Sequence, residues 1–395
     1  MNNNFLDKNE RIKEAICTFR AEPSGDTYKA IFQQMCERMT ADGHFLIPVW
    51  RPEEQDSDDL SFNLHQLQTE DGGIWLVAFT DEEELHKGQE TGIVSNFIDT
   101  FFDMVFTTPY VEGFVLNPWG ETNFMFSKAM MQAVINLMED EADPAKSNEL
   151  LEKAIHFATE KHAGGVRKGT NRLYIGHPLE VMTILNRMDA DNNLLMAGLL
   201  HDTVEDTDTT YMDIKNTFGM DVAALVMAYT KNPDQTWEEV RKHKIAAMDD
   251  ATFRVKLLIM ADMTANLRSL WKDYRYCGEE LWERFNAPKE KQAWYYGSMQ
   301  DKLWDMQKYM ETAEVYWEMV GLYKDLFVEF YIDENTDTIY QNCADGTCYA
   351  LERATCEWHL AKLPEGLPVA ERHLAERIED NWRDQLGKYE YNWRN

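Results

Sequence analysis

A run of apolar residues passes directly into a cluster of titratable groups between residues 194 and 207. The stretch reads Leu194-Leu195-Met196-Ala197-Gly198-Leu199-Leu200-His201-Asp202-Thr203-Val204-Glu205-Asp206-Thr207. Its first seven residues predict a buried helix. Charge buried without a partner costs several kcal/mol. A divalent metal ion at His201 and Asp202 would remove that cost, so the stretch predicts a metal site.

Further ligands stand on either side of this stretch. His177 precedes Pro178, which suits the first turn of a helix, so its imidazole lies at a helix entry. Asp262 ends another apolar run, where an aspartate also needs a partner. We therefore predict His177, His201, Asp202 and Asp262 as metal ligands. Nitrogen and carboxylate donors favour Mn²⁺, with Mg²⁺, Fe²⁺ or Zn²⁺ as alternatives.

Two acidic residues remain beyond the predicted ligands. If the helix continues, Glu205 lies one turn after His201, and Asp206 lies one turn after Asp202. They would face metal-bound water without being ligands, and one would act as general base. The alternative is a solvated acidic pair at a helix end.

The overall charge restricts the possible partners. The 395 residues carry a net charge of −31, which argues against nucleic acid or an anionic membrane as a partner. One window reverses this field, because residues 161–178 hold Lys161, Arg167, Lys168 and Arg172 and no acidic residue. We interpret the window as an anion cradle, with a solvated basic face as the alternative.

The chain shows no sign of a membrane or secreted location. No apolar run reaches the roughly 18 residues of a membrane span, and the first residues lack a signal-peptide pattern. The six cysteines form no disulfide framework. We expect a soluble, cytoplasmic protein.

Changes of pattern along the chain predict a multidomain protein. Residues 1–24 form a helical lead-in, and 25–140 alternate strands and helices as an α/β domain. After the acidic break at 139–144, residues 146–312 are helical throughout and predict an all-α domain. Residues 313–395 predict a small α+β appendage, with a hairpin at Asp333-Glu334-Asn335-Thr336.

The first of these domains resembles the SseB N-terminal domain family. The resemblance rests on Ile47-Pro48-Val49, on Val77-Ala78-Phe79-Thr80 before an acidic helix, and on Gly113-Phe114-Val115-Leu116-Asn117-Pro118. It covers roughly residues 27–138 and carries no assigned chemistry. We interpret the domain as a recognition or regulatory module that would contact a protein partner.

The all-α domain resembles the HD superfamily of metal-dependent phosphohydrolases, and most closely the hydrolase domain of RelA/SpoT enzymes and small alarmone hydrolases. The matching pieces, in order, are 158–162, Arg167-Lys168-Gly169, Tyr174-Ile175-Gly176-His177-Pro178, 201–207, Phe218-Gly219, Thr230-Lys231, and Ala261-Asp262 with Asn266. The resemblance covers about residues 148–310.

The resemblance implies a role for each site residue. It assigns the metal to His177, His201, Asp202 and Asp262, and catalysis to Glu205 and Asp206. Arg167 and Lys168 resemble the residues that hold the base and phosphates, and Asn266 resembles the contact on the ribose side. We add Lys161, from the basic window, as a substrate contact. The implied reaction removes the 3′-pyrophosphate of (p)ppGpp to give GDP or GTP and pyrophosphate.

Some features leave the substrate and the class of function open. The family usually has a lysine where Ile259 stands, and nearby basic residues are replaced by Met263 and Ala265. Another nucleotide such as NADPH is therefore an alternative substrate. A third hypothesis is a non-catalytic immunity or binding factor for a toxin. The pair Tyr295-Tyr296 would offer a stacking surface, although its helical spacing favours core packing. No synthetase domain follows residue 310, so we expect hydrolysis only.

Overall fold

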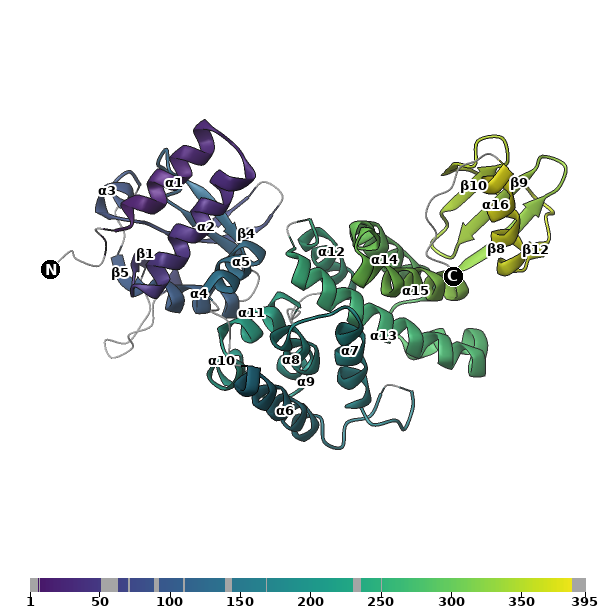
Figure 1. Cartoon of the computed structure of the whole chain (residues 1–395), viewed down its shortest axis with the longest axis horizontal. Coiled ribbons are helices and arrows are strands. Elements are labelled where there is room, and N and C mark those ends of the chain that lie inside the picture. The colour runs from purple at the N-terminus through teal and green to yellow at the C-terminus, as the bar shows by residue number, and fades with distance from the viewer. Residues whose placement is uncertain are drawn as a thin grey trace. The chain divides into compact units, whose positions relative to one another are not determined.

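The computed structural model describes most of the chain (Figure 1). The described residues are 6, 8–50, 63–69, 72–88, 92–108, 111–138, 144–167, 169–229, 236–249 and 251–385. They form two compact units. The first comprises Met1–Lys161, Asn192–Pro233 and Asp250–Val255, and the second comprises His162–Asp191, Asp234–Asp249 and Lys256–Asn395. None of the described helices is long and apolar enough to cross a membrane.

The first unit begins with the N-terminal module, which we define as the elements from α1 to α5. In chain order these are α1 (Glu10–Ala21), α2 (Gly25–Thr40), β1 (His44–Trp50), β2 (Asn63–Leu64), β3 (Gln66–Gln68), β4 (Ile74–Ala78), α3 (Glu82–Leu85), β5 (Gly92–Phe97), α4 (Ile98–Thr107), β6 (Val111–Leu116), β7 (Phe124–Ser127) and α5 (Lys128–Met138).

The strands of the N-terminal module form two sheets. One is antiparallel with the order β2-β1-β5, and the other has the order β3-β4-β6-β7 with β4 and β6 parallel. A parallel pair needs a crossover, which contains α4. Paired hydrogen bonds of 2.9 Å between Leu46 and Phe79 join the two sheets. The core is aromatic, with Phe45, Phe101 and Phe114 fully buried and in mutual ring contact.

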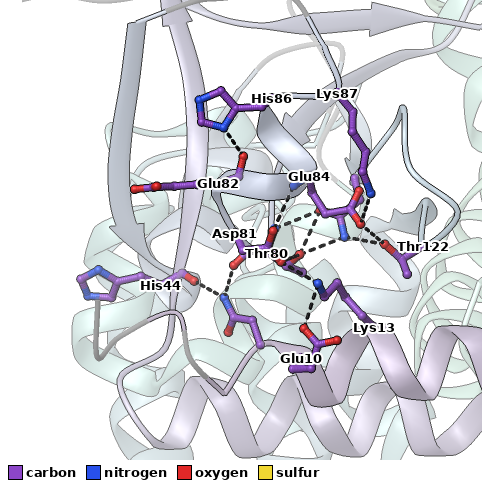
Figure 2. A network of polar contacts seen from close by, with 12 residues as sticks. Glu10, Lys13, His44, Thr80, Asp81, Glu82, Glu84, His86, Lys87 and Thr122 are labelled. Atoms are coloured by element: carbon purple, nitrogen blue, oxygen red, sulfur yellow. Dashed lines mark hydrogen bonds and ion pairs between the residues drawn. The ribbon is translucent and has the colours of Figure 1, made fainter. Parts of the chain in front are cut away.

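A polar network lies where α1 meets the loop before α3 (Figure 2). Asn9 donates to the carbonyl oxygens of His44 and Thr80, each at 2.8 Å. Lys13 pairs with Asp81 at 2.9 Å. Glu84, only 4% exposed, accepts from Lys87 at 2.9 Å. The Asn9 and Lys13 contacts join segments far apart in the chain, so they fix the start of α1 next to β1 and the loop before α3.

The rest of the first unit is helical. Its helices are α6 (Pro144–Lys161), α8 (Asn192–Leu200), α9 (Thr203–Asp206), α10 (Tyr211–Phe218) and α11 (Met220–Tyr229), with the start of α13 (Phe253–Cys277). α8 packs against α6 and α11, and its residues from Leu194 to Leu200 are all buried. The condition that one helix continues to Glu205 is not met, because α8 ends at Leu200 and α9 is a separate turn.

The second unit holds the remaining helices. These are α7 (Gly176–Arg187), α12 (Trp237–Ala247), most of α13, η2 (Gly278–Arg284), α14 (Lys289–Lys302), η3 (Trp304–Lys308) and α15 (Met310–Phe327). Glu318 of α15 accepts from Arg187 of α7 at 3.1 Å and from Arg268 of α13 at 2.5 Å. One carboxylate therefore ties three helices together.

A sheet covered by a helix ends the second unit. The order β11-β10-β9-β8-β12 is antiparallel, with β8 (Val328–Asp333), β9 (Thr338–Cys343), β10 (Cys348–Glu352), β11 (Trp358–Leu360), β12 (Val369–Ala370) and α16 (Arg372–Gln385). The predicted hairpin is confirmed, since β8 and β9 pair around 334–337. Phe330, Ile339, Leu351 and Trp382 form the core between the sheet and α16.

The observed elements agree with the predicted fold class at the level of its main parts. The N-terminal module mixes helices with strands in two sheets, and a helical region follows it. The division at 24, 140, 146 and 312 stays a prediction.

Candidate metal centre

The first predicted ligand lies at the start of α7. His177 is in the first turn of this helix, and Pro178 follows it. Proline is tolerated there because the first amide groups of a helix have no partner within the helix. The imidazole Nε2 lies 3.1 Å from Oδ1 of Asp262, which is on α13. Both side chains are buried, His177 to 6% and Asp262 to 5% exposure. An imidazole and a carboxylate therefore meet without bulk water.

His201 lies just after the end of α8 and is 1% exposed. Its Nδ1 lies 2.8 Å from the carbonyl oxygen of Gly198, which can only accept, so Nδ1 carries the proton. Nε2 then presents a lone pair, the arrangement that metal-binding histidines use. Oδ2 of Asp202 lies 3.2 Å from this Nε2.

Three ligand atoms, one each from His177, His201 and Asp262, lie within 4.8 Å of one another. All three residues are buried, and within the described residues this is the one group with such geometry. In the protonation states that bind metal, the imidazoles and the carboxylate would point lone pairs at one another, and a divalent cation would offset their repulsion. The residues present therefore fit a metal ion.

A hydrogen-bonded chain extends from Asp262 to the basic window. Asn266, one turn further along α13, donates from Nδ2 to Oδ1 of Asp262 at 2.6 Å. Arg167 donates from Nη2 to the Asn266 side-chain oxygen at 3.0 Å. The loop carrying Arg167 is closed by a bond from its amide to the carbonyl of Arg172, at 2.9 Å. The structure thus brings Arg167, Asn266, Asp262 and His177 together.

The remaining predicted residues are placed differently. Glu205 is half-buried and Asp206 is exposed, both in α9, and the Asp206 amide donates to the Asp202 carbonyl at 2.9 Å. Lys161 donates to Asp208 at 2.7 Å. Lys168 lies outside the described residues. The roles of these residues, and of Asp202 as a fourth ligand, stay predictions.

A pair of buried tyrosines on α14 lies beside a further cation. Tyr295 and Tyr296 of α14 are 3% and 8% exposed, which supports core packing for this pair. Burial raises the pKa of Tyr296 far above its ordinary value. The positive charges of Arg241 and Arg167 lower this pKa, and the negative charge of Asp262 raises it further. The Arg241 guanidinium stacks over the Tyr295 ring at 4.3 Å. Motif spacing did not single out Arg241, which the structure places against the buried Tyr295 ring.

Two family models match the chain. The HD domain model matches residues 154–283, and the model of the SseB protein N-terminal domain matches residues 12–133. The first range contains every residue of the buried histidine and aspartate group, and the second lies almost wholly in the N-terminal module. Both resemblances drawn from the sequence are confirmed.

Individual relatives match the helical part of the chain. A guanosine-3′,5′-bis(diphosphate) 3′-pyrophosphohydrolase of Aquifex aeolicus is 42% identical over 128 residues, which is 31% of this chain and 18% of that protein. The guanosine-3′,5′-bis(diphosphate) 3′-pyrophosphohydrolase MESH1 of Danio rerio is 34% identical over 34% of this chain and 75% of its own length. Its counterpart in Xenopus tropicalis is 37% identical over 34% of this chain and 74% of its own length.

The extent of these matches shows the family. The chain spans a small share of the Aquifex protein, but it covers most of both vertebrate proteins. Given also the HD-domain match over the buried group of His177, His201 and Asp262, this chain belongs to the HD-domain family that includes the guanosine-3′,5′-bis(diphosphate) 3′-pyrophosphohydrolases.

Proposed function

We propose that the chain is a metal-dependent hydrolase that removes the 3′-pyrophosphate of (p)ppGpp, giving GDP or GTP and pyrophosphate. The observation that carries the proposal is the buried group His177, His201 and Asp262 inside the matched HD domain. The names of the relatives support the choice of substrate. Within this chain we propose hydrolysis alone, because the described residues after α15 form a small sheet with one helix.

Mn²⁺ is the metal that we propose, held by His177, His201 and Asp262, with Asp202 as a fourth ligand. Nitrogen and carboxylate donors suit it, and Mg²⁺, Fe²⁺ or Zn²⁺ are the alternatives. When bound, the ion would supply Lewis-acid polarisation of a phosphoryl oxygen. The Gly198 carbonyl, by holding the proton on Nδ1, keeps the His201 ring in the tautomer that such a site requires.

Glu205 and Asp206 are the residues that we assign to proton transfer. Glu205 lies four residues after His201, Asp206 lies four residues after Asp202, and both retain contact with solvent. One carboxylate would accept a proton from the attacking water while the water oxygen forms a bond to phosphorus. The bond between phosphorus and the 3′-oxygen breaks, and the 3′-oxygen takes up a proton.

We assign substrate binding to Arg167, Lys168, Lys161 and Asn266. Arg167 uses one guanidinium nitrogen on Asn266, which leaves further N–H donors with a planar geometry suited to phosphate. A cation at this position lowers the repulsion between an anionic nucleotide and a chain of net charge −31.

A direct assay tests this function. The purified chain with Mn²⁺ should release pyrophosphate from ppGpp, and His201→Ala should lower kcat by at least about 1000-fold because a ligand of the ion is lost. His156→Ala, at an exposed position of α6, is the matched control and should retain activity. A wild-type chain that is inactive with every alarmone would exclude the proposed substrate.

A second substrate class has one observation in its favour. Ile259, Met263 and Ala265 are uncharged and at most 2% exposed. These positions on α13 therefore add no cation beside Asp262. A nucleotide with fewer phosphate charges, such as NADPH, would need fewer cations. Competition between NADPH and ppGpp decides between them, since the better substrate has the higher kcat/KM.

A further inference from the structure

A buried carboxylate outside the metal-binding group connects three parts of the first unit. Asp221, in the first turn of α11, is 1% exposed. Arg254 donates to both of its oxygens, at 2.8 and 2.9 Å. Asn193 donates to Oδ2 at 3.0 Å, and Gln132 donates to Oδ1 at 2.5 Å. Such a carboxylate is stable only while its donors remain in place.

Two of the donors begin the helices that lead to the metal ligands. Asn193 is the second residue of α8, and His201 follows it by eight residues. Arg254 is the second residue of α13, and Asp262 follows it by eight residues. At 1.5 Å per residue, each ligand lies roughly 12 Å along the chain from its anchor. Asp221 therefore anchors the first turn of both helices.

The third donor comes from the N-terminal module. Gln132 of α5 is fully buried, and its amide also donates to Asn136 at 3.0 Å. The Asn136 oxygen accepts from Arg254 at 2.8 Å. Two residues of the module thus hold both the carboxylate and the guanidinium of the Asp221–Arg254 pair.

A second contact reinforces this arrangement. Asp103 of α4 accepts from the Tyr211 hydroxyl of α10 at 2.7 Å and also pairs with Lys215. The ring of Phe106 stacks on Tyr211, with ring centres 6.2 Å apart. The module is therefore fixed to α10 and α11 by α4 as well as by α5.

We propose that Gln132 and Asn136 are positioning residues for the metal centre, so that the N-terminal module sets the affinity of the hydrolase helices for the ion. The inference rests on the proposed function for its biological meaning. Without the two amides, the Asp221–Arg254 pair loses part of its hydrogen bonding. The first turns of α8 and α13 then lose a fixed anchor, and the ligands at their far ends lose alignment.

The test measures Mn²⁺ binding directly. In the full-length chain, Gln132→Met keeps the side-chain length but removes both amide groups. Calorimetric titration with Mn²⁺, without nucleotide, should show a Kd raised roughly tenfold, the effect of losing one hydrogen bond to a charged group. Gln33→Met, at an exposed position of α2 in the same module, should leave the Kd unchanged. At saturating Mn²⁺ the KM for the nucleotide should stay at its wild-type value.

The outcomes distinguish an effect on the position of the metal ligands from an effect on the stability of the fold. A Gln132→Met variant with a lowered melting temperature but wild-type Mn²⁺ affinity would overturn the proposal. Asn136→Ala, at a half-buried position, is the second variant and should also weaken Mn²⁺ binding. Loss of folding in both variants would also contradict a positioning role.

The inference and the proposed function can fail independently. A wild-type chain that binds Mn²⁺ but cleaves no alarmone would refute only the proposed function, because Mn²⁺ affinity alone judges the role of Gln132. A chain that hydrolyses ppGpp, with equal Mn²⁺ affinity in wild type and Gln132→Met, would refute only the positioning role.

Discussion

At the scale of single residues, Asn266 connects Asp262 of the buried group to a cation, Arg167. Its amide donates to Asp262 at 2.6 Å, and its carbonyl oxygen accepts from Arg167 at 3.0 Å. One side chain therefore orients both a proposed metal ligand and a proposed phosphate contact. No residue with only a donor or only an acceptor can serve both partners.

Replacing Asn266 tests this double role. Asn266→Ala removes the acceptor of the Arg167 hydrogen bond, so the KM for the nucleotide should rise about tenfold as the guanidinium loses this constraint on its orientation. Steady-state kinetics at saturating Mn²⁺ measures the change. Asn186→Ala, exposed on α7, is the control and should behave as wild type. An unchanged KM for Asn266→Ala would remove Asn266 from substrate binding.

At the scale of single helices, the start of α3 depends on a charged N-cap residue, Asp81. Burial disfavours the ionised form of Asp81. The Glu84 amide at 2.9 Å, the ammonium of Lys13 and the hydroxyl of Thr80 outweigh this effect, so the pKa of Asp81 lies below its ordinary value (Figure 2). The unfolded chain then takes up a proton at higher pH than the folded chain does.

Acid should therefore weaken this end of the N-terminal module. The stability that Asp81 contributes is present above its unfolded pKa, about 3.9, and is lost as the pH falls below that value through the folded pKa. Asp81→Asn keeps a capping side chain without the charge, so its melting temperature should fall less than that of wild type between about pH 5 and pH 3. Asp26→Asn, exposed in the first turn of α2, is the control. Parallel acid profiles for wild type and Asp81→Asn would contradict this role.

At the scale of the whole molecule, the N-terminal module, α6 and the helices from α8 to α11 belong to one compact unit. Asp103, Gln132 and Asn136 of the module contact α10, α11 and the first turn of α13. These contacts include charged and buried polar groups, whose separation leaves donors and acceptors unpaired. We expect the module and these helices to unfold together.

Tyr211→Phe probes this shared unit with a minimal change. The ring contact with Phe106 remains possible, but the hydroxyl that donates to Asp103 is lost. Urea titration should show the free energy of unfolding lowered by about 1–2 kcal/mol, because the acceptor is a carboxylate. Hydrogen exchange should speed up in both α4 and α10. Tyr276→Phe, at an 82% exposed position, is the control. Faster exchange in only one of the two helices would contradict joint unfolding.

Local patterns were sufficient to predict many of the elements and the chemistry. The buried helix at 194–200, the strand from His44 and the hairpin after β8 follow from periodicity and turn residues that act over a few positions. Whether α8 continues to Glu205 was left open by the sequence, because periodicity does not show where a helix ends, and α8 ends at Leu200. A buried aspartate in an apolar segment identified Asp262, and the same signal would have identified Asp221 at the start of α11.

By itself, the sequence determined the family to which the chain belongs and predicted which residues would hold a metal ion. His177, His201 and Asp262 stood out because titratable groups next to apolar runs need a partner. Only the tertiary structure decided which of them converge, that Asn266 joins Asp262 to Arg167, and that Gln132 reaches Asp221 across 89 residues of chain. The physical reason is that a hydrogen bond depends on distance and direction in space, and sequence patterns record these only between near neighbours in the chain.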